Sequence, residues 1–167
     1  MLALYLTIWI ALVLFTAGET GRAFRRHGQS PAPWAWWAFV LGLALAVAHT
    51  LIAFDVVHNW VHEDAVRSTA LQTEAVFGVA AGWGVYVNYV FFAVWLADAW
   101  WWRVERRGYA RPPAVIWTLR AFYMLMIVNG AVVFAAGVRR LLGLLIVSWL
   151  TRIWVSPPIP ARSSPPP

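Results

Sequence analysis

The chain has 167 residues, of which 62% are hydrophobic and only 12% are charged, with a formal net charge of +6. A water-soluble domain of this size would carry far more charge on its surface. Its 13 basic residues are all arginines, gathered in short clusters between apolar runs. This pattern orients membrane proteins and argues against nucleic-acid binding. The absence of cysteine excludes disulfides, thiolate metal sites and cysteine nucleophiles.

Four apolar runs come close to the ~20 residues that a helix needs to cross the hydrocarbon core of a bilayer. They are residues 2–18, 34–54, 75–102 and 114–136. The first run starts at Met1 without basic residues before it, so we expect a retained span and not a cleaved signal peptide. No glycine or proline stands between Gly42 and Gly78, so we expect the second helix to continue past the bilayer to about Asp64.

A fifth apolar run, residues 141–155, is short for a span. Two interpretations stay open for it: a short fifth transmembrane helix, which we favour, or an amphipathic helix in the outer headgroup region. Arg139 and Arg140 precede this run, which counts against an outside location for the turn before it. Residues 156–167 are mostly proline and serine, cannot bury a core and are expected to be disordered.

The distribution of arginines predicts the orientation of the bundle. Arginines follow the first and third runs, whereas acidic residues dominate the link between the second and third runs. The residues concerned are Arg22, Arg25 and Arg26, then Arg103, Arg106, Arg107 and Arg111, and in the link Glu63, Asp64 and Glu74 against Arg67. The positive-inside rule then places the N-terminus outside and both arginine clusters in the cytoplasm. The sequence therefore predicts an all-α, multi-pass protein of the cytoplasmic (inner) membrane, with residues 1–155 as one helical bundle.

An acid and two histidines stand close together where the second run ends. On one continuous helix, Asp55, His58 and His62 would share a face, and two histidines four residues apart can hold one divalent cation. Asp55 would be a third ligand or would orient a histidine, and Glu63 or Glu74 would supply a further ligand. The alternative is that these polar residues only cap and solvate a helix end that emerges into water.

Three polar side chains are expected near the middle of the membrane: His49, Asn88 and Asn129, in the second, third and fourth runs. Counting inward from the tryptophan belts places them at about the same depth, and ionisable residues there usually face the interior of a bundle. We therefore predict a polar layer of these residues and Thr50, hydrogen-bonded across helices. Such bonds commonly specify helix pairing. The functional alternative makes His49 a proton-site or quinone-site residue.

Two opposite charges are expected to pair at the inner end of the bundle. Asp98 lies near the end of the third run, and Arg120 lies within the first two turns of the fourth. Buried charges on neighbouring antiparallel helices satisfy each other, so we interpret this ion pair as structural. Glu19, just past the first run, is expected to be solvated at the membrane interface.

The sequence lacks the motifs that would identify a common enzyme class, and we lean against an enzyme. It has no lysine, no G-x-S-x-G and no H-E-x-x-H. Haem would require Met124, Met126 or a second protomer as an axial partner, because the histidines near the membrane lie on one helix. Three hypotheses remain, in this order: a non-catalytic membrane subunit or scaffold that binds a protein partner or itself, a metal- or haem-binding redox component, and a small proton-coupled transporter.

Overall fold

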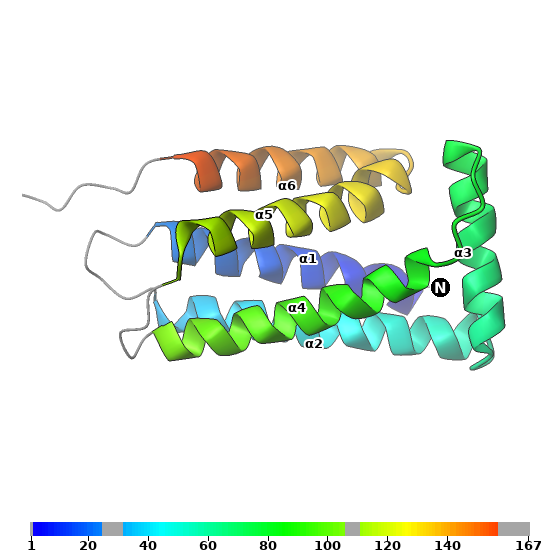
Figure 1. Cartoon of the computed structure of the whole chain (residues 1–167), viewed down its shortest axis with the longest axis horizontal. Coiled ribbons are helices and arrows are strands. Elements are labelled where there is room, and N and C mark those ends of the chain that lie inside the picture. The colour runs from blue at the N-terminus through cyan, green and yellow to red at the C-terminus, as the bar shows by residue number, and fades with distance from the viewer. Residues whose placement is uncertain (1, 25–31, 106–110, 157–167) are drawn as a thin grey trace, which may run out of the picture.

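The structure is a computed structural model, and it describes residues 2–24, 32–105 and 111–156. Over these ranges the chain forms helices and no strand, which confirms the predicted all-α class. The elements are α1 (Leu2–Ala23), α2 (Pro33–Val56), α3 (His62–Phe77), α4 (Gly84–Glu105), α5 (Pro113–Val128), the π-helix η1 (Asn129–Val133) and α6 (Val138–Val155). In Figure 1, α3 lies across one end of a bundle of the other α-helices, called here the α3 end.

Three helices within the described ranges are long and apolar enough to cross a membrane. They are α1, α2 and the continuous segment Pro113–Val133, which α5 and η1 form together. The helices α4 and α6 have similar lengths but are less apolar, because α4 contains Asp98 and several tryptophans and α6 contains three arginines. The length and composition of the three apolar helices support the expectation of a membrane protein.

An aromatic layer fills the centre of the bundle. Phe15 of α1 contacts Phe39 of α2, Trp95 of α4 and Tyr123 of α5, with ring centroids 5.4, 5.0 and 5.1 Å away. All four side chains are buried. Most of these ring pairs are tilted or edge-to-face, the arrangements that aromatic quadrupoles favour. The aromatic layer therefore joins four helices at one level.

The expected continuation of the second helix to about Asp64 is wrong. The helix α2 ends at Val56, the chain turns over residues 57–61, and α3 begins at His62. Because α3 then runs across the end of the bundle, it does not prolong α2 (Figure 1). The residues that a single helix would have placed on one face are therefore divided between a helix end, a turn and the start of another helix.

The turn forms without glycine or proline. Asn59 and Trp60 adopt positive φ angles of 48° and 60°. Asparagine tolerates this left-handed region better than most residues, whereas a tryptophan there needs support from its surroundings. The Trp60 indole N–H supplies such support by donating a hydrogen bond of 3.0 Å to the Asp55 carboxylate.

The third predicted span, 75–102, also begins too early. The helix α3 ends at Phe77 and is followed by Gly78 in the left-handed conformation, with φ of 72°, a common way to terminate a helix. The next helix, α4, starts only at Gly84. The apolar residues between these glycines extended the hydropathy signal across a helix boundary.

The last two predicted runs correspond closely to helices. The run 114–136 matches α5 with η1, and the run 141–155 lies within α6, which returns alongside α5 (Figure 1). Of the tail 156–167, only Ser156 belongs to the described residues. Four arginines of the two clusters that we predict to lie in the cytoplasm are outside the described residues as well: Arg25, Arg26, Arg106 and Arg107.

A glycine allows α6 to pack directly on η1. A Cβ atom added to Gly143 would overlap the carbonyl oxygen of Ala131. We therefore expect Gly143→Ala to push α6 away from η1 and to lower the free energy of unfolding by about 1–3 kcal/mol. Unfolding in mixed micelles with a denaturing detergent measures this loss.

Gly130→Ala is the matched control, because nothing lies within 4 Å of a Cβ atom added there. Both substitutions replace a helical glycine, so they share the gain in helix propensity. Equal stability of the two variants would contradict the close contact between α6 and η1.

Candidate functional site

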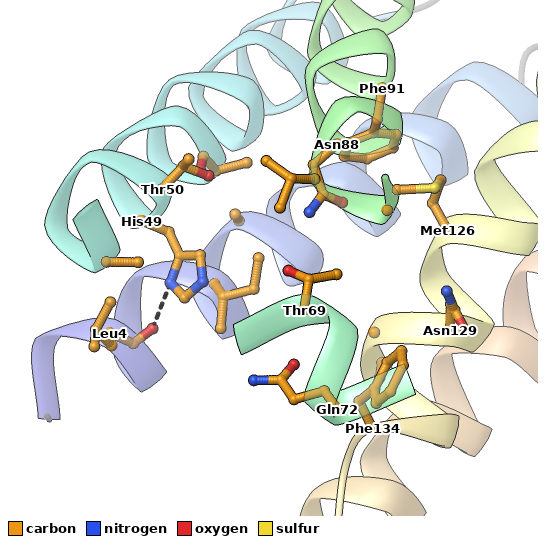
Figure 2. Close-up of a pocket in the computed structure, with 18 of the residues that line it drawn as sticks. Leu4, His49, Thr50, Thr69, Gln72, Asn88, Phe91, Met126, Asn129 and Phe134 are labelled. Atoms are coloured by element: carbon orange, nitrogen blue, oxygen red, sulfur yellow. Dashed lines mark hydrogen bonds between the residues drawn. The ribbon is translucent and has the colours of Figure 1, made fainter. Parts of the chain in front are cut away.

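A cavity of about 680 Å³ lies at the α3 end of the bundle, between α3 and the neighbouring parts of α1, α2, α4, α5 and α6. Its volume falls within the roughly 300–1,000 Å³ of typical small-molecule sites. Apolar side chains such as Phe91, Trp95 and Met126 form much of its wall. Figure 2 shows Phe91 and Met126 together with polar side chains such as Thr69, Gln72 and Asn88 around the cavity.

The residues of the predicted polar layer all line this cavity. His49 and Thr50 come from α2, Asn88 from α4 and Asn129 from η1 (Figure 2). In the part of the chain that the structure describes, the amides of Asn88 and Asn129 make no hydrogen bond to the protein, and Thr50 donates to Ala46 of its own helix. The predicted hydrogen bonds across helices are therefore wrong for Thr50, Asn88 and Asn129, and His49 alone of the four bonds to a neighbouring helix. The four residues instead surround a shared space.

His49 is held by α1 and presents one ring nitrogen to the cavity. Its Nδ1 lies 2.9 Å from the carbonyl oxygen of Leu4 and 3.4 Å from Oγ1 of Thr7. A carbonyl oxygen only accepts, so Nδ1 donates the hydrogen, and Nε2 of the neutral ring is an acceptor. In Figure 2 the ring stands with Nδ1 toward Leu4 and its other nitrogen on the cavity side. The arrangement leaves a fixed acceptor for a ligand.

The helix α3 adds polar lining that sequence reasoning missed. Ser68, Thr69, Gln72 and Thr73 face the cavity. They recur at i, i+1, i+4 and i+5, a spacing that places them on one face of a helix. Reading residues 62–77 as a separate helix would have revealed this polar face.

The π-helix forms part of the cavity wall. Within η1, Asn129 and Gly130 line the cavity, and the backbone N–H of Phe134 donates to the carbonyl oxygen of Asn129 at 3.0 Å. This i→i+5 bond defines a π-bulge, a distortion that is rare and frequently occurs at functional sites. If this segment were a continuous α-helix, the residues after Asn129 would lie on different faces of the helix than they do in the structure.

The residues of the predicted metal site have other partners. Asp55 accepts the hydrogen bond from Trp60, and the His62 ring nitrogens lie 3.3 and 3.4 Å from the hydroxyls of Tyr86 and Tyr89. His58 packs edge-on against Phe54, and Glu63 and Glu74 are exposed on α3. Among the described residues, no three His, Asp or Glu side chains are grouped to hold a metal ion.

An ionic cluster joins the helices at the end of the bundle opposite α3. Asp98 is only 2% exposed; it accepts hydrogen bonds from Arg111, from Arg22 at 3.3 Å and from the Tyr123 hydroxyl at 2.8 Å. Arg120 donates to the carbonyl oxygen of Trp154 at 3.1 Å. The structure thus gives Asp98 partners that sequence reasoning did not single out.

Glu19 belongs to the same cluster, so the expectation that it is solvated is wrong. It is 3% exposed. Its carboxylate accepts from Arg22 at 3.3 Å and from the indole of Trp154 at 2.8 Å. Because Trp154 is on α6, these bonds connect α1 with the last helix. The ionic cluster (Glu19, Arg22, Asp98 and Arg111) is a structural element with little exposed surface.

The cavity is therefore the part of the described structure best suited to hold a ligand, since it combines space with hydrogen-bonding groups that the protein does not use itself. Comparisons of the chain with models of protein families, with curated proteins and with solved structures found no match.

Proposed function

We propose that this chain is a multi-pass membrane protein that binds a small amphipathic molecule in the cavity beneath α3. One observation carries the proposal: polar groups from three separate elements converge on one apolar-walled cavity without protein partners of their own. These groups are Nε2 of His49 and the amides of Asn88 and Asn129. A polar group without a partner is costly inside a membrane, and a bound ligand with a polar head would satisfy these groups.

The proposed topology has five crossing helices with the N-terminus outside. The helices α4 and α6 run alongside the three more apolar ones, which supports a crossing for each (Figure 1). The acidic residues of α3 and the arginine clusters at the opposite end support an outer position for α3 by the positive-inside rule. The cavity would then open in the outer half of the cytoplasmic membrane.

Binding accounts for the described structure better than the earlier alternatives. A metal or haem site at Asp55, His58 and His62 would first need these side chains to leave their present partners. A proton path from the cavity to Asp98 would have to cross the aromatic layer, in which Trp95 lines the cavity and Tyr123 reaches Asp98. A non-catalytic subunit remains compatible, with ligand binding as its role.

Filling the cavity is expected to abolish binding. In Ala53→Phe, a ring would occupy space at the cavity wall, whereas Ala44→Phe adds the same ring to an exposed position of the same helix. We expect the wild type to carry about one molecule of an added single-chain amphiphile in native mass spectra. Ala53→Phe should lower its affinity by tenfold or more, corresponding to about 1.4 kcal/mol.

Ala44→Phe should bind like the wild type. Oleyl alcohol and oleate are suitable probes, since both combine one apolar chain with a small polar head. If the wild type bound neither probe, or if both phenylalanine variants bound equally well, the proposed function would be wrong.

A further inference from the structure

Arg139 is the charged side chain among the described residues that line the cavity. Those residues include no aspartate or glutamate. A ligand with a negative head would therefore meet no carboxylate in this cavity. A neutral head would need only the amides and the histidine, and would leave the presence of an arginine unexplained.

Arg139 is placed to interact with a ligand. It lies in the first turn of α6, and its guanidinium carbon is 4.6 Å from the centroid of the Tyr5 ring. This cation–π contact holds the planar guanidinium of Arg139 in place. No carboxylate among the described residues accepts a hydrogen bond from its N–H groups. Arg22, Arg67 and Arg111, by contrast, each contact a carboxylate.

The neighbouring arginine has a different task. Nε of Arg140 donates to the carbonyl oxygens of Val132 and Ala135, at 3.0 and 2.9 Å, and so satisfies backbone groups where η1 ends. Arg140 is thus explained by the fold. Arg139 is not, and in the proposed topology it stands on the outer side, where the positive-inside rule disfavours arginine.

We propose that the ligand is an anionic amphiphile with one apolar chain, whose carboxylate or phosphate is bound by Arg139 at the cavity and whose chain lies against the apolar walls. This inference rests on the proposed function and adds the chemical class of the ligand. Guanidinium binds carboxylate and phosphate through two parallel N–H donors, which gives Arg139 a specific partner. The cavity volume suits one chain better than the two chains of a phospholipid.

The test compares three probes that share one chain and differ in the head: oleate, oleyl phosphate and oleyl alcohol. Binding to the detergent-purified full chain is measured at a pH well above the pKa of oleic acid. We expect the wild type to prefer at least one anionic probe over the alcohol by about tenfold, the effect of one charge-assisted hydrogen bond. The stronger of the two anionic probes distinguishes a fatty acid from a single-chain phosphate as the source.

Arg139→Gln should remove this preference while affinity for the alcohol stays unchanged, and Arg139→Lys should keep part of it. Arg140→Gln is the matched control, since it removes the same charge one residue away, and it should retain the preference. An Arg139→Gln variant that still prefers the anions, or a wild type that prefers the alcohol, would overturn this inference and leave the proposed function standing. A wild type that binds none of the three probes would overturn both.

Discussion

Replacing Asp98 with alanine is expected to lower the free energy of unfolding by about 3–5 kcal/mol, the usual loss when one partner of a buried ion pair is removed. The Asp98 carboxylate is almost completely buried and contacts Arg22, Arg111 and the Tyr123 hydroxyl. Alanine takes away the carboxylate that the buried Arg111 guanidinium contacts and leaves the tyrosine hydroxyl without its acceptor. The substitution would thus remove the polar contacts that join α4 to α1, to α5 and to the segment before α5.

Asp64→Ala is the matched control, because Asp64 pairs with Arg67 at 4.0 Å on the exposed surface of α3. Exposed pairs of this kind contribute roughly 0–1 kcal/mol, so the control should remain close to the wild type. Asp98→Asn should fall between the two, since an amide keeps an acceptor for Tyr123 and loses the negative charge. Reversible unfolding in mixed micelles provides the comparison. A loss in Asp98→Ala no larger than in Asp64→Ala would show that the ionic cluster contributes little to stability.

The contrast between the polar layer and the ionic cluster shows what the sequence could predict. Counting depth from the membrane surface brought His49, Asn88 and Asn129 to one level, and the structure gathers them around one cavity. This worked because helices that run alongside one another keep depth proportional to residue number. The depth of a residue in the membrane does not determine the direction of its side chain. The sequence therefore could not predict the cavity that separates these three side chains.

The hydrogen-bond partners of Glu19 and Asp98 could not be predicted from the neighbouring sequence. Glu19 bonds to Trp154, 135 residues away, and Asp98 bonds to Arg111 across the connection between α4 and α5. Both contacts depend on which helices pack against each other, and the hydropathy pattern of the sequence does not determine this. The boundary between α2 and α3 escapes sequence analysis for a different reason. A stretch without glycine and proline predicts an unbroken helix, whereas Asn59 and Trp60 form a turn with positive φ angles.

Removing the ring of Phe15 is the second change expected to have a large effect. Phe15 is 1% exposed and contacts rings from three other helices, so Phe15→Ala would leave a cavity at the centre of the aromatic layer. We expect the free energy of unfolding to fall by about 3–5 kcal/mol. Inside a bilayer, lost packing contacts are the main cause of such a loss, because lipid chains are as apolar as the side chain.

Val13→Ala is the matched control, because Val13 lies two residues earlier on the same helix and is 57% exposed, outside the aromatic layer. This substitution should lower the free energy of unfolding by less than about 1 kcal/mol, as is usual for exposed positions. The same unfolding assay compares the two variants, and equal losses would contradict a packed aromatic layer. If Phe15→Ala is the more destabilised, packing in the aromatic layer holds α1, α2, α4 and α5 together. The proposed binding cavity and the ionic cluster lie at opposite ends of the bundle, with the aromatic layer between them.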